Sequence, residues 1–166
     1  MAIEHDFFGV IQDNGFGGLR WSSEAELGDQ VVAIDLTADD ETAVNDAQLA
    51  LAAAVLHALQ GFDARARDAL IAQLSERESV TAHYVDFHVD TMGESLLDLL
   101  VHNSGDIPMD VLRSLQLVHV GLFPQRDADG DAFAEFDYSI SPDDTEYLLV
   151  VSFDIQGDVS AVDMAN

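Results

Sequence analysis

The 166-residue sequence contains no cysteine and no lysine. Without cysteine, the protein can form neither disulfide bonds nor thiolate metal sites. No run approaches the roughly 18 apolar residues of a membrane-spanning helix. The segment from Met1 to Asp6 lacks the basic and apolar regions of a signal peptide. We therefore expect a cytoplasmic protein. The Gly-x-Ser-x-Gly motif of serine hydrolases is also absent, so no nucleophile is indicated.

Positive charge is scarce. Six arginines stand against 32 aspartates and glutamates, which gives a net charge of −26. Such a surface repels nucleic acids and anionic membranes, because both bind proteins through cationic side chains. Two interpretations of the acidity stay open. The first is attraction to a cationic protein partner. The second is adaptation to high salt, or a genome composition that favours arginine over lysine. This second interpretation predicts that carboxylates cover the whole surface and are densest near residues 127–131 and 143–146.

The length predicts a single domain spanning residues 1–166, and 48% hydrophobic residues are enough for a sizeable core. The pattern at the two ends of the chain is that of strands. Residues 18–36 form a hairpin with its turn at Gly28-Asp29, and the C-terminal third forms a four-strand meander. The predicted strands of the meander are 115–123, 133–140, 147–153 and 159–164.

The central part of the chain is helical in pattern. Between 38 and 78, apolar residues recur at helical spacing, which predicts a helical hairpin. Gly61 is expected to end its first helix, and Thr37 with Asp40 resembles a capping pair for its start. Residues 85–90 alternate as a strand would, but the helical pattern fits most of 82–102 better. The predicted fold is α+β, a mostly antiparallel sheet with the central helices packed on one face.

The C-terminal third also carries a resemblance. Phe136-Asp-Tyr-Ser-Ile140, a short polar turn, and Tyr147-Leu-Leu-Val-Val-Ser-Phe-Asp154 followed by Gly157 resemble a family of small acidic bacterial proteins annotated only as a domain of unknown function. The order of elements elsewhere in the chain agrees with this family. The resemblance implies an α+β fold and a bacterial source, and it implies no activity.

Two groups of residues are weak candidates for a metal site. The first is His83, Asp86, His88 and Asp90, three of which share a face if the segment is a strand. The alternative for this group is a solvated polar face. The second group is Asp127, Asp129 and Asp131, which resembles the start of a calcium loop. However, the later EF-hand positions hold Ala132 and Tyr138, so an acidic turn fits better.

No residue pattern indicates a catalytic or cofactor-binding site. His119 lies in an apolar strand, where a hydrogen-bonded structural role is expected. The function we expect is therefore that of a non-enzymatic binding protein, which could recognise a basic protein as acidic immunity or inhibitor proteins do. The alternative is a metal-assisted hydrolase that uses the region from His83 to Asp90. An enzyme requires polar groups that converge in a cleft, whereas a binding module requires an exposed acidic or apolar face.

Overall fold

The computed structural model describes residues 3–13, 18–39, 44–101, 103–124 and 132–166. Eight strands and five helices occur in these ranges, which confirms the predicted α+β fold with a mostly antiparallel sheet. The strands are β1 (Ile3–His5), β2 (Gly9–Asp13), β3 (Leu19–Leu27), β4 (Gln30–Ala38), β5 (Gln116–Leu122), β6 (Ala134–Ser139), β7 (Leu148–Phe153) and β8 (Val159–Ala165). The helices are α1 (Asp46–His57), α2 (Leu59–Gln73), α3 (Val80–Met92), α4 (Glu94–Leu99) and α5 (Ile107–Ser114).

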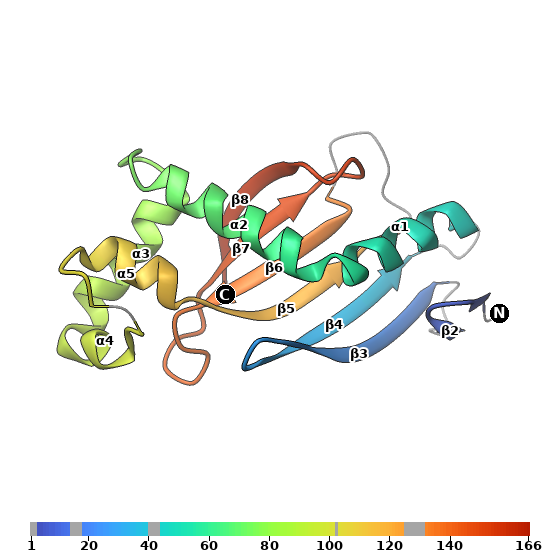
Figure 1. Cartoon of the computed structure of the whole chain (residues 1–166), viewed down its shortest axis with the longest axis horizontal. Coiled ribbons are helices and arrows are strands. Elements are labelled where there is room, and N and C mark those ends of the chain that lie inside the picture. Colours follow the sequence, from blue (N-terminus) through green and yellow to red (C-terminus); the bar gives the residue numbers. More distant parts are fainter. Residues whose placement is uncertain (1–2, 14–17, 40–43, 102, 125–131) are drawn as a thin grey trace.

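The sheet consists of two antiparallel halves. Strands β1 to β4 form one half and β5 to β8 the other, each in sequence order. The halves meet where β4 and β5 pair in parallel, with Ala33 opposite His119 and Leu36 opposite Leu122. We call this pairing the seam. A parallel pair needs a crossover connection, and here all five helices lie within it (Figure 1).

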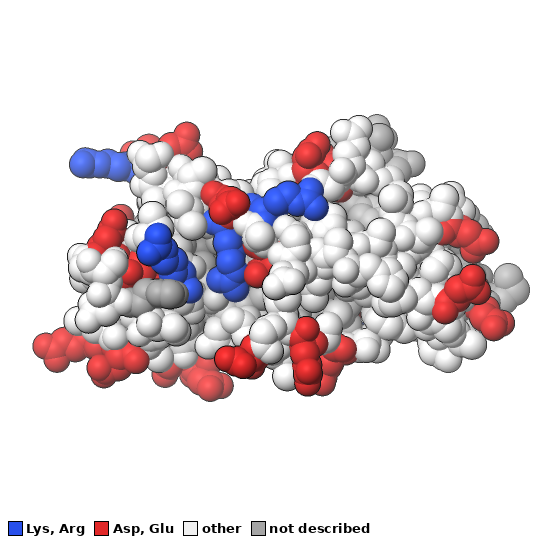
Figure 2. Space-filling model, in the orientation of Figure 1, with Lys and Arg blue, Asp and Glu red and all other residues white. Residues whose placement is uncertain are grey.

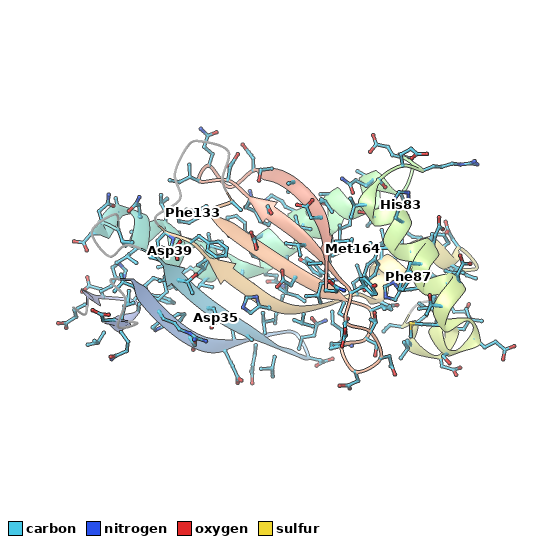
Figure 3. All side chains as sticks on the ribbon, turned by 180° about the vertical axis from the view of Figure 1, so that it is seen from behind. Asp35, Asp39, His83, Phe87, Phe133 and Met164 are labelled. Carbon is cyan, nitrogen blue, oxygen red and sulfur yellow. The ribbon has the colours of Figure 1, made fainter. Side chains whose placement is uncertain are left out.

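The helices cover the sheet unevenly. Helices α1 and α2 run one after the other across one face, whereas α3, α4 and α5 gather at one end of the sheet (Figure 1). Seen from behind, the strands lie in front of α1 and α2, and none of the helices in the described ranges crosses the middle of the sheet on that side (Figure 3). One broad face of the sheet is therefore open.

The core lies between the sheet and α1 and α2. In β4, Val32, Ile34, Leu36 and Ala38 are buried, and the residues between them face the other side. This alternation follows from the two-residue period of a strand. Residues that pair with an inward residue of β4 face inward too, so the register identifies the inward residues of the neighbouring strands. From the helices, buried residues such as Leu49 meet this apolar layer.

The predicted helical hairpin between 38 and 78 is wrong. The helical bonds continue from α1 into α2, since the Ala58 N–H donates to Ala54 and the Phe62 N–H donates to Ala58. Gly61 lies inside α2, where a glycine costs only about 1 kcal/mol. The chain changes direction instead between α2 and α3 (Figure 1).

The predicted start of the first helix is also wrong. Thr37 belongs to β4, and the cap is Asn45, whose side chain accepts a hydrogen bond from the Gln48 N–H. The Gln48 side chain accepts one from the Asn45 N–H in return, which completes a capping box. Helix rather than strand is confirmed for 80–92, where Ser79 caps α3. Gly93, with φ of 55°, separates α3 from α4.

Candidate functional site

The first candidate metal group does not assemble. His83, Asp86 and Asp90 are exposed on α3, whereas His88 is only 1% exposed and points into the protein. Within the described residues, no three or more histidine, aspartate or glutamate side chains are placed to hold a metal ion. Asp127, Asp129 and Asp131 lie outside the described residues, so the second group is not addressed. The interpretation of 83–90 as a solvated face is wrong for His88.

Both ring nitrogens of His88 are hydrogen-bonded. Nδ1–H donates to the Tyr84 carbonyl at 2.7 Å, because a carbonyl oxygen can only accept. Nε2 lies 2.9 Å from the Thr145 hydroxyl, and in the neutral ring this nitrogen accepts from that hydroxyl. Burial lowers the pKa of His88, which favours the same neutral state. His88 thus joins α3 to the loop before β7, in a structural role.

Tyr84 forms a second link between the same regions. Its hydroxyl accepts a hydrogen bond from the Ile140 N–H at 3.1 Å and donates to the Tyr147 carbonyl at 3.4 Å. Desolvation by burial raises the pKa of this phenol, so it stays protonated. Together, His88 and Tyr84 hold the end helices against the C-terminal half of the sheet.

The open face of the sheet is the most distinctive surface of the described residues. We define it as the side chains of β3 to β8 that point away from α1 and α2. The register assigns them: Asp35 lies opposite Ser22 and Gly121, and Asp137 lies opposite His119 and Val150. By the same alternation, the open face carries six carboxylates and two basic side chains: Glu24, Glu26, Asp35, Glu135, Asp137 and Asp163, with Arg20 and His119.

A row of hydrogen bonds crosses the centre of this face. His119 Nε2 donates to Asp35 Oδ2 at 2.8 Å, and Nδ1 donates to Asp137 Oδ2 at 3.0 Å. The Ser22 hydroxyl donates to the other oxygen of Asp35 at 2.5 Å. The row therefore connects β3, β4, β5 and β6 and crosses the seam. Figure 3 shows Asp35 on the face seen from behind.

The two carboxylates make His119 a cation at neutral pH. The hydrogen bond to Asp137 is the largest cause that raises the pKa of His119, to about 9, and the bond to Asp35 adds to it against the effect of burial. The pKa of Asp35 is lowered, mainly by the hydrogen bond from Ser22 and then by that from His119. The three ionised groups carry a net charge of −1.

This geometry does not suit nucleophilic catalysis. An imidazolium with both N–H groups engaged has no lone pair to take a proton. The Ser22 hydroxyl donates to Asp35 rather than to the histidine, so the histidine does not activate it. The row is a set of charges held in fixed positions, which suits recognition of a charged surface.

Sequence reasoning identified only part of this arrangement. It gave His119 a hydrogen-bonded structural role, which agrees with its two partners. It did not single out Asp35 or Asp137, which are 84 and 18 positions away from His119. Their alternation with buried neighbours is a signal that could have placed them outside the core, but only the strand register brings them to the histidine.

No family model matches the chain, and no curated protein or solved structure matches it either. The resemblance to a family of small acidic bacterial proteins therefore stays a prediction. Among the helices in the described ranges, none is both long and apolar enough to cross a membrane.

Proposed function

We propose that this protein is a non-enzymatic binding protein that docks a cationic protein on the open face of its sheet, as an acidic inhibitor or immunity protein does. The observation that carries the proposal is the open face itself: six carboxylates on a broad surface that none of the described helices crosses. Complementary charge steers such partners together and sets their register on the surface.

The distribution of arginines supports this choice of face. Of the five arginines in the described residues, Arg20 alone lies on the open face, beside Asp35. The others belong to α2, to the turn after it and to α5: Arg65, Arg67, Arg77 and Arg113. Figure 2 shows arginine atoms gathered over this helical side. Carboxylates occur on both sides of the molecule, and on the open face six of them share the surface with Arg20 and His119.

The open face is large enough for a stable complex. Six strands at about 4.8 Å spacing span roughly 24 Å, and strands of six to nine residues extend for about 20–30 Å. The resulting footprint is on the order of 500–700 Å², close to the roughly 800 Å² that each partner contributes to a standard interface. The sheet also presents these charges rigidly, which lowers the entropic cost of binding.

A metal-assisted hydrolase finds less support. That alternative needs His83, Asp86, His88 and Asp90 to converge, and α3 directs His88 into the core and the other three to solvent. A bacterial source and a cytoplasmic location are part of the proposal. They agree with the acidic inhibitor role and with the family resemblance.

The test uses hen lysozyme as a basic probe protein and two triple variants of equal charge. The first variant removes open-face charge by Glu24→Gln, Glu135→Gln and Asp163→Asn. The second removes charge from the helical side, at three exposed carboxylates: Asp68→Asn, Glu78→Gln and Asp90→Asn. Calorimetric titrations at low and moderate salt measure the affinity of each variant for the probe.

We expect the open-face variant to bind lysozyme at least about tenfold more weakly than the helical-side variant, with a shallower salt dependence. Amide NMR shifts on titration with lysozyme should map to β3 to β8. Equal losses in the two variants, or shifts on the helices, would show that only net charge matters and would remove the basis for this face. A toxin gene next to the gene for this protein would identify the natural partner.

A further inference from the structure

A groove of about 800 Å³ lies at the end of the seam nearest the β3–β4 turn. Its walls are the tip of the β3–β4 hairpin, α2 and α5, and its floor is the start of β5. This part of the molecule is visibly hollowed beside the arginine atoms (Figure 2). The volume falls within the range of about 300–1,000 Å³ that is usual for ligand sites.

The groove exists because β4 and β5 diverge. Their ladder covers Ala33 to Leu36 only, so the strands are not paired with each other over Gln30–Val32 and Gln116–Val118. Side chains replace the missing strand pairing at two points. The Gln30 side chain accepts from the Leu117 N–H at 2.9 Å, and Arg67 Nη1 donates to the Leu115 carbonyl at 2.8 Å.

Two arginines of different character line this groove. Arg67 is held in place: its Nε donates to both oxygens of Asp63 at 3.1 Å, and Asp63 accepts from the Tyr138 hydroxyl at 2.6 Å. Arg113, in the last turn of α5, is exposed, and no ion pair of Arg113 occurs among the described residues. The guanidinium of Arg67 is therefore held in a fixed orientation, and that of Arg113 is available to bind a ligand.

The charge balance limits the ligand to a single negative charge. Asp29 and Asp63 offset Arg67 and Arg113 within the lining, and the whole chain carries −26. A dianion such as phosphate is repelled twice as strongly by this field as a monoanion. A carboxylate matches the planar donor pair of a guanidinium and carries only one charge.

The rest of the lining suits a peptide. Val31 and Val101 are exposed at 60% and 78%, and they offer apolar contact to side chains. Gln60 and Gln116 are exposed amides that can both donate to and accept from peptide groups. From these observations we infer that the groove binds the C-terminus of a short extended peptide, with its terminal carboxylate on Arg113 and the free N–H groups of Arg67.

The probe for this site is N-acetyl-Gly-Val-Leu with a free carboxylate, titrated into the isotopically labelled full chain. The same tripeptide with an amidated terminus is the control that lacks only the charge, and inorganic phosphate is the control for a simple anion. About 0.3 M NaCl screens the general repulsion by the acidic chain. Arg113→Gln is compared with Arg77→Gln, which removes an exposed arginine outside the groove.

We expect the acid to cause saturable amide shifts at Val31, Val101 and Gln116, with a dissociation constant of about 0.1–1 mM. The Arg113→Gln variant should bind about tenfold more weakly, and Arg77→Gln should bind like the wild type. Equal binding of the amidated peptide, equal binding of phosphate, or an unchanged affinity in Arg113→Gln would each overturn the inference.

Discussion

Replacement of His119 by glutamine should remove a pH-dependent part of the stability. The pKa of this histidine is raised in the folded protein from 6.5 to about 9. A group whose folded pKa is raised stabilises the fold fully below its unfolded pKa. The stabilisation is therefore complete below about pH 6.5 and is lost as the pH rises through about 9.

The magnitude follows from the same shift. At about 1.4 kcal/mol for each pH unit, the rise corresponds to at most roughly 3.5 kcal/mol. The side chains of His119 and Asp35 are 32% and 36% exposed, so solvent screens part of the interaction. We therefore expect the wild type to exceed His119→Gln by about 1–2 kcal/mol near pH 6. The difference should fall below about 0.5 kcal/mol near pH 10.

Urea unfolding at a series of pH values measures this difference. About 0.5 M NaCl in every sample screens the long-range field of the acidic chain, while contact pairs persist. His83→Gln, at an exposed histidine of α3, is the control and should keep the wild-type loss of stability above pH 6.5. The titration of His119 followed by NMR gives its pKa directly. A midpoint near 6.5, or a difference that stays constant from pH 6 to 10, would refute the reasoning.

Three further predictions concern the core and the charge. His88→Ala should cost about 2–4 kcal/mol, because it leaves a cavity and removes two hydrogen bonds. The pKa of His88 is lowered, so the wild type should lose stability as the pH falls below about 6.5, and the variant should lack this acid-side loss in urea unfolding at pH 5 to 7. Leu49→Ala should cost about 2–4 kcal/mol and Leu51→Ala under about 1 kcal/mol in the same assay, because Leu49 is 1% exposed and Leu51 is 40% exposed; equal costs would contradict the observed orientation of α1. The melting temperature measured by calorimetry should rise between about 0.1 and 1 M NaCl, since salt screens self-repulsion at a net charge of −26. A melting temperature that stays constant or falls as salt is added would contradict a destabilising self-repulsion.

The strands could be predicted from the sequence because inward and outward side chains alternate along each strand. In β6, Phe136 and Tyr138 are buried and Asp137 is half-buried, and the same alternation of apolar and acidic residues can be read from the sequence. The boundaries of the helices were harder to predict from the sequence. Gly61 has the chemistry of a helix end, but the hydrogen bonds on either side of it continue, and Phe62 and Ala66 of the same helix are buried. Packing overrides local propensity there.

The site itself depends on information that a single strand does not contain. The position of His119 beside Asp35 follows from the parallel pairing of β4 with β5, which no local pattern specifies. The groove likewise depends on the point at which these two strands diverge. A pattern along the chain can identify which side chains avoid the core, and the register decides which of them meet.

The seam also has a consequence for how the chain folds. Within each half of the sheet, neighbouring strands are close in sequence, so the halves can form from local contacts. The seam joins positions 86 apart, since Ala33 pairs with His119, and closing a flexible loop of that length costs roughly 4 kcal/mol of chain entropy. We therefore expect the joining of the halves to be the slow step of folding. A variant such as Asp35→Asn should then lower the folding rate measured by stopped flow, whereas a substitution within the β7–β8 pair should act mainly on the unfolding rate.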